Sequence, residues 1–196
     1  MTKATFPHMG TLAIPMKSLF ANLGLEPVAP PPTSQSTIAI GTKLAPEFAC
    51  LPLKINLGNY VEAIAKGAEL ILMAGGVGPC RFGYYSQVQR EALRDAGYKV
   101  ELVTLEAPNA DPGELLRQIK KFIPRHSPAA LFNALRIFWK KARAIDIFDR
   151  LANQIRARGE YPGAVSLIQY KFYHVIDQAE SLKDIKTVLD DYLKEL

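Results

Sequence analysis

The chain has 196 residues, of which 48% are hydrophobic and 22% charged, as is typical of a globular protein with a full core. No apolar run reaches the roughly 18 residues that a membrane span needs, and the N-terminal residues lack the layout of a signal peptide. We therefore expect a cytoplasmic protein without a membrane partner, whose two cysteines are too few for a disulfide framework.

The net charge of +5 is unevenly distributed along the chain. Residues 1–108 hold nine cations and eight acids, residues 113–158 hold eleven and three, and residues 159–196 hold four and seven. The basic middle segment fits an acidic partner protein or a phosphorylated ligand, and equally a solvated helix face. Because nucleic-acid-binding motifs are missing, we expect no nucleic-acid partner.

The first half predicts alternating strands and helices. The apolar residues 69–74 are typical of a central parallel strand buried on both faces. The alternation predicts an α/β domain with a flavodoxin-like parallel sheet of about four strands in the order 2-1-3-4. The expected strands are 4–7, 26–29, 69–74 and 99–105, and the expected helices are 11–23, 33–41, 51–66 and 82–96, with Gly24 and Gly41 as helix ends.

The second half has a helical period throughout. Ser127 and Pro128 are typical of a cap and a first-turn proline. The expected helices are 113–122, 127–158, 164–179 and 182–196. We therefore predict two parts, an α/β domain over 1–108 and a helical extension over 109–196.

A glycine-rich loop follows the central strand and carries the strongest local signal. Gly75, Gly76 and Gly78 allow backbone N–H groups to turn toward a ligand, and Cys80 stands at a helix start. Partial positive charge there, with Arg81 beside it, favours the thiolate that a metal cluster or a nucleophile needs. The alternative is a tight turn with an inert cysteine.

A second cysteine has the same setting, because Cys50 also precedes a helix start with Pro52 just inside it. In such sheets ligands bind beyond the carboxyl ends of the strands, where the strand order reverses. That rule brings the loop after the first strand, with His8 and Gly10, to the same edge as Cys80. His8 is therefore a candidate proton donor or hydrogen-bond donor.

Several familiar motifs are absent. The sequence has no P-loop motif, which argues against an ATPase, and its glycine loop does not match the dinucleotide pattern. Its three histidines do not cluster as zinc ligands, and it has no nucleophile elbow.

Three motifs resemble the 2-hydroxyacyl-CoA dehydratase family and its activase-related members. They are TFPHMG at 5–10, PEFACLPLKINLGNY at 46–60 and MAGGVGPCRFGYY at 73–85. The resemblance implies flavodoxin-like domains and an iron–sulfur cluster, [4Fe–4S] in type, with Cys50 and Cys80 as ligands. It also implies a lyase component that eliminates water from a 2-hydroxyacyl-CoA after electron transfer from an ATP-driven activator protein.

The larger members of that family draw a further cysteine from a second flavodoxin-like domain, whereas this sequence has two cysteines in all. Three outcomes follow from this difference. A homodimer supplies two thiolates from each subunit, a second dehydratase-like subunit supplies the missing ligands, or the domain has lost its cluster. The main alternative function is a cluster-free scaffold that binds a partner through its basic helices.

Overall fold

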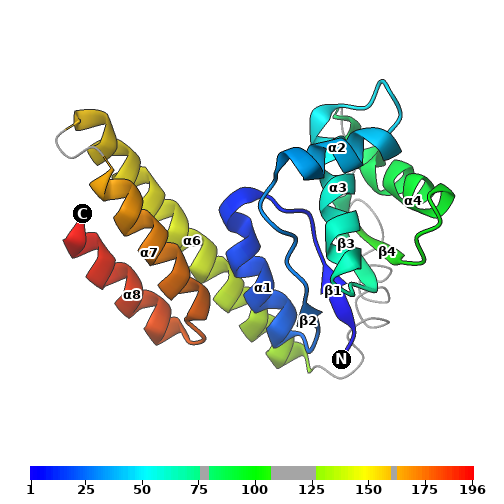
Figure 1. The fold of residues 1–196 in the computed structure, drawn as a ribbon. Coiled ribbons are helices and arrows are strands. Elements are labelled where there is room, and N and C mark those ends of the chain that lie inside the picture. Colours follow the sequence, from blue (N-terminus) through cyan, green and yellow to red (C-terminus); the bar gives the residue numbers. More distant parts are fainter. Residues whose placement is uncertain (76–79, 107–126, 160–162) are drawn as a thin grey trace. The chain divides into compact units, whose positions relative to one another are not determined.

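The computed structural model describes residues 1–75, 80–106, 127–159 and 163–196. Contacts divide the chain into two compact units. The first unit begins with Met1–Ala13, resumes at Gly24 and contains the sheet, and the second consists of Ile14–Leu23 and Ser127–Leu196. Figure 1 labels the elements of both units.

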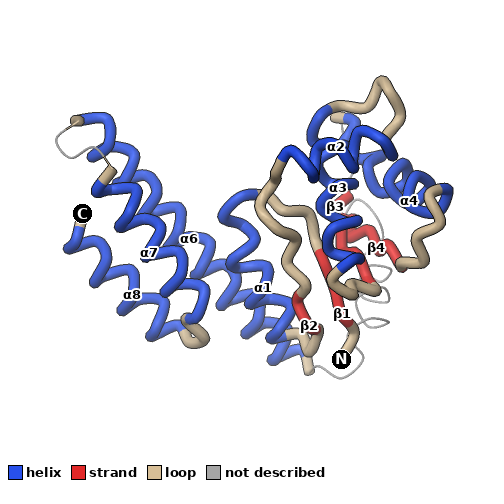
Figure 2. Tube along the Cα trace, in the orientation of Figure 1, coloured by secondary structure: helices blue, strands red, loops and turns tan. Residues whose placement is uncertain are grey.

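The first unit contains a four-stranded sheet in the order β2-β1-β3-β4, with every neighbouring pair parallel (Figure 2). This confirms the predicted flavodoxin-like order. Ala4 of β1 pairs with Pro27 on one side and Leu70 on the other, so β1 is interior to the sheet. The strands are β1 (Lys3–Thr5), β2 (Glu26–Pro27), β3 (Leu70–Gly75) and β4 (Glu101–Glu106).

Helices α3 and α4 pack on the sheet face that carries Ile71 and Met73. Leu57 and Tyr60 of α3 and Leu93 of α4 fill this core and are almost fully buried. Burial of apolar surface of this kind is the main stabilising term of a domain. The helical elements of the unit are η1 (Gly10–Leu12), α2 (Gln35–Leu44), α3 (Leu51–Ala65), η2 (Arg81–Tyr84) and α4 (Tyr85–Asp95).

The helix predicted to end near Gly41 continues for three residues beyond it, to Leu44. Gly41 is a packing position: a Cβ atom added to it would lie 1.7 Å from the carbonyl oxygen of Lys54. A Cβ atom on Gly58 would likewise lie 2.0 Å from the carbonyl oxygen of Thr37. These two glycines let α2 and α3 touch backbone to backbone, and they fix the first turn of α3 in the unit.

The second unit is helical, as predicted for the C-terminal half. Its elements are α1 (Ala13–Asn22), α6 (Pro128–Arg158), α7 (Ala164–Gln178) and α8 (Leu182–Glu195). Ser127 caps α6 and Ser181 caps α8 through their side-chain oxygens. The core is centred on Phe148 and Phe172, whose stacked rings have centroids 4.0 Å apart.

Helix α1 joins the C-terminal helices, although the sequence placed it in the α/β part. Ile14 packs on the core of the helical unit, and Lys17 forms an ion pair with Asp177. Lys141 of α6, which is fully buried, donates to the hydroxyl of Ser18 and to the carbonyl oxygen of Asp177. The unit is therefore assembled from two separate stretches of sequence.

In the described part of the chain, no helix combines the length and the apolar character that crossing a membrane requires. The predicted helix at 113–122 lies outside the described residues.

Candidate thiol site

The two cysteines stand at the starts of successive helical elements, as the sequence predicted. Cys50 is the N-cap residue of α3 and Cys80 the N-cap residue of η2, and both are free and exposed. Because α3 runs back toward the start of β3, its first turn lies at the carboxyl end of the sheet. Cys80 follows the carboxyl end of β3 itself.

Tyr85, the first residue of α4, contacts the first of the two cysteines, Cys50. Its phenol is buried, and this burial raises the pKa of Tyr85 to about 12, with further contributions from the hydrogen bond and charge of Cys50 and from the charge of Cys80. A phenol with so high a pKa stays protonated at neutral pH and is held as a hydrogen-bond donor.

Cys50 is held in a setting that stabilises its thiolate. The Tyr85 hydroxyl lies at hydrogen-bond distance, 2.6 Å, from the Cys50 sulfur and is placed to donate to it when the thiol ionises. This hydrogen bond is the main cause that lowers the pKa of Cys50 below its usual 9.0. Burial, the second-largest influence, raises the pKa, whereas the backbone N–H groups of Leu53 and Cys50 and the charge of Arg81 lower it further. Cys50 therefore has the ionisation behaviour of a metal ligand or a nucleophile.

A cavity of about 270 Å³ opens beside the Cys50 sulfur. Its rim is apolar and exposed: Phe48 and Tyr84, which line the cavity, are 81% and 69% exposed, and Leu51, which follows Cys50 in the chain, is 55% exposed. Exposed aromatic side chains that gather beside a polar site are typical of surfaces that another molecule covers. The cavity is lined by Pro46, Phe48, Ala49, Cys50, Leu53, Arg81, Tyr84, Tyr85 and Val88.

The structure gives less support for the other predicted site residues. His8 is half-buried beyond the end of β1, and within the described ranges it has no hydrogen bond to either thiol. Gly10 begins η1 with a φ of +58°, and Gly75 ends β3. Gly76 and Gly78 lie outside the described residues.

Metal ligation by this chain is limited to two thiols as far as the structure describes it. Among residues 1–75, 80–106, 127–159 and 163–196, no group of three or more His, Cys, Asp or Glu side chains is placed to hold a metal ion. The predicted ligands Cys50 and Cys80 therefore have no third His, Cys, Asp or Glu ligand placed with them among the described residues.

Tyr85 is the functional residue that sequence reasoning missed. It lies within the third quoted motif and opens the helix that follows Cys80, but its contact with Cys50 spans 35 residues of sequence. The contact between Tyr85 and Cys50 becomes apparent only when α3 and α4 are seen to pack on the same face of the sheet.

No protein-family model matches the chain, and no curated protein matches it either. The resemblance in the three motifs therefore stays a prediction, and the geometry around Tyr85 carries the functional argument.

Proposed function

We propose that Cys50 and Cys80 hold an iron–sulfur cluster and that the protein handles electrons in an assembly related to the 2-hydroxyacyl-CoA dehydratases. The observation that carries this proposal is the stabilised thiolate of Cys50, hydrogen-bonded to Tyr85 beside a second exposed cysteine. A bound cluster would supply one-electron transfer at this edge of the sheet.

The donor set suits such a cluster. Thiolates are its usual ligands, and hydrogen bonds to the sulfurs tune its potential. Tyr85 provides such a hydrogen bond to Cys50, and Arg81 adds a positive charge nearby. These residues lower the pKa of the Cys50 thiol and hold its sulfur at the start of α3.

On this proposal, a second chain supplies the remaining ligands of the cluster. A four-iron cluster takes four ligands, or three and an open position, and one chain offers two thiols. The exposed rim of Phe48, Leu51 and Tyr84 supports an interface at this place, because aromatic residues are enriched where protein surfaces meet. A homodimer would supply two thiolates from each subunit, and a second dehydratase-like subunit would serve the same purpose.

The motif resemblance extends the proposal to the surrounding assembly. It supports an ATP-driven activator protein as the electron donor and an acyl-CoA as the substrate of the complete lyase.

The test is the iron and acid-labile sulfide content of the anaerobically reconstituted protein, measured together with its mass in solution. We expect about two iron atoms per chain in a dimer, lost in Cys50→Ser and in Cys80→Ser. Phe48→Asp keeps both thiols but places a charge in the rim, so it is expected to lose both the dimer and the cluster. Tyr170→Phe, an exposed tyrosine of α7, serves as the control that changes neither.

Two results would contradict the proposal. One is a folded, reconstituted dimer that contains no iron. The other is iron that remains at the same stoichiometry after both cysteines have been replaced by serine.

A further inference from the structure

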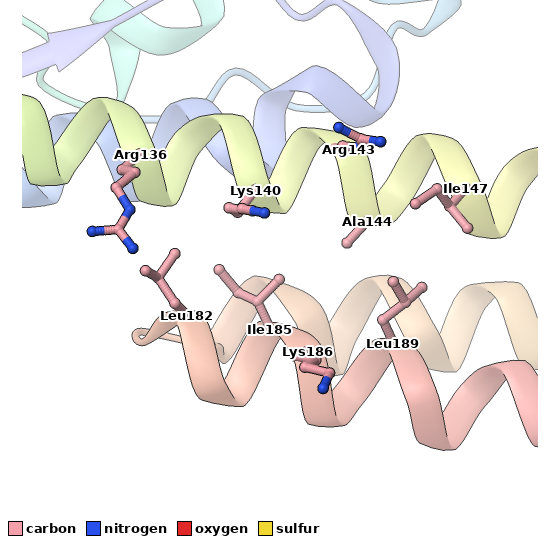
Figure 3. Close-up of a pocket in the computed structure, with 9 residues that line it drawn as sticks. All are labelled: Arg136, Lys140, Arg143, Ala144, Ile147, Leu182, Ile185, Lys186 and Leu189. Atoms are coloured by element: carbon pink, nitrogen blue, oxygen red, sulfur yellow. The ribbon is translucent and has the colours of Figure 1, made fainter.

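The second unit contains a groove between α6 and α8 that is separate from the thiol site. Its cavity has a volume of about 370 Å³, and its lining residues come from these two helices alone (Figure 3). Ala144 and Ile185 are buried at its floor, and Ile147 is 39% exposed at its side. The apolar lining residues are Ala144, Ile147, Leu182, Ile185 and Leu189.

Four cations surround this apolar floor: Arg136, Lys140 and Arg143 on α6, and Lys186 on α8. Over the part of the chain that the structure describes, none of the four forms an ion pair. The neighbouring acid on α6, Asp146, pairs with Arg150 instead. The groove is therefore apolar at its base, with Arg136 and Lys140 of α6 and the single lining cation of α8, Lys186, beside it.

The cations do not converge on one point. In Figure 3 the side chain of Arg136 extends toward Leu182 of α8, whereas that of Arg143 lies on the other side of α6. At 1.5 Å per residue, Arg136 and Arg143 are about 10 Å apart along the helix axis. A small amphiphile with a single anionic head cannot reach all of them, so the ligand that fits has several acids along its length.

The spacing of the lining residues favours a helix. On α6 the lining positions 136, 140, 143 and 147 are spaced by four, three and four residues, close to the helical repeat of about 3.6, so they form one row along the helix. On α8 the apolar positions 182, 185 and 189 follow the spacing that receives a partner helix. Phe132 and Trp139, 67% and 66% exposed, extend the apolar surface of α6 beside this row.

We propose that the α6–α8 groove binds an acidic amphipathic helix of a partner protein. Its apolar residues, at i, i+3 or i+4, and i+7, would lie on the groove floor, and flanking Asp and Glu side chains would pair with the four cations. The partner helix would pack against α6 and α8 as an additional helix of the unit that already contains α1 and α7. The cations of the groove, which form no ion pair among the described residues, would increase its affinity for such a helix.

The experiment uses the full chain and a designed helical peptide of about 20 residues, with Leu at the seam, Glu on both flanks and no Trp. Trp139 is the single tryptophan of the chain, so its emission reports binding directly, and calorimetry gives the affinity. We expect a blue shift of Trp139, binding that weakens with salt, and a loss of about tenfold or more in Lys140→Glu/Arg143→Glu. Lys171→Glu, a single charge reversal at an exposed position of α7, should alter the affinity by less than about twofold.

A second variant tests the apolar half of the groove. Ile147→Asp should weaken the peptide while leaving the helical circular dichroism unchanged, because Ile147 is partly exposed. The proposal is overturned if a peptide with Lys on its flanks, or a Glu-rich peptide without the Leu seam, binds as tightly. It is also overturned if anionic vesicles shift Trp139 and the peptide does not, or if the groove variants abolish self-association of the chain, which would make a second copy the occupant.

Discussion

Gly41 of α2 and Lys54 of α3 are in backbone contact, since a Cβ atom on Gly41 would lie 1.7 Å from the Lys54 carbonyl oxygen. Lys54 belongs to the first turn of α3, which begins directly after Cys50. The packing of α2 on α3 at Gly41 therefore helps to position the first turn of α3, and with it the thiol of Cys50, although Gly41 is not in contact with that thiol.

Gly41→Ala should destabilise the first unit, although alanine is normally the better helix former by about 1 kcal/mol. The added methyl group meets backbone rather than a side chain that can move, so we expect a net loss of about 1–3 kcal/mol in the free energy of unfolding. Urea unfolding followed by circular dichroism measures it. Thr42→Ala, on the exposed side of the same helix, should change the value by less than about 0.5 kcal/mol, and an equal effect of the two would refute the packing role.

The same glycine shows where sequence reasoning ends. The strand order and most helix ranges could be predicted, because they follow from local periodicity, caps and the alternation of elements. Gly41 was interpreted as a helix end because a glycine that stops a helix and one that packs on another helix are identical in sequence. The difference lies in Lys54, thirteen residues away, and no local pattern indicates it.

The site was predictable to a similar degree. Both cysteines could be placed at helix starts from sequence, and the parallel order brought them to one edge. Tyr85 could not be found in this way, since its bond to Cys50 depends on the packing of α3 against α4. The assignment of α1 to the helical unit was missed for the same reason, because Lys17 and Ser18 meet partners more than 120 residues away.

Tyr85→Phe should raise the pKa of the Cys50 thiol, because the variant removes the hydrogen bond that is the main cause of its depression. The thiolate absorbance in the ultraviolet, followed against pH in Cys80→Ser backgrounds, measures the change, and iodoacetamide at neutral pH should react more slowly. Tyr84→Phe is the matched control, because Tyr84 lines the same cavity without a bond to Cys50. An unchanged titration in Tyr85→Phe would show that the phenol does not stabilise the thiolate.

Gln89→Leu should be neutral or stabilising by about 1 kcal/mol. Gln89 lies on α4 one turn after Tyr85, it is fully buried, and neither atom of its amide has a hydrogen-bond partner among the described residues. A leucine of similar volume removes the cost of burying that unpaired amide. Gln87→Leu on the exposed side of α4 controls for helix propensity. A loss of more than about 1 kcal/mol in Gln89→Leu alone would reveal a partner elsewhere in the chain or assembly.

Lys141→Met should change how the stability of the helical unit depends on pH. Burial lowers the pKa of the Lys141 ammonium below its usual 10.5, although the Asp177 carboxylate acts in the opposite direction. Between the folded pKa and 10.5 the unfolded chain binds more protons than the native protein, so the free energy of unfolding rises with pH in that window. The unfolding free energy of the native sequence, relative to Lys141→Met, is therefore expected to increase from neutral pH to about pH 10.

Lys140→Met, its exposed neighbour on α6, controls for the loss of one charge and should show no such trend relative to the native sequence. Urea unfolding at a series of pH values gives both differences. A difference for Lys141→Met that stays constant with pH would mean that the buried ammonium is fully compensated by Asp177 and by its bonds to α1, and that burial does not control its titration.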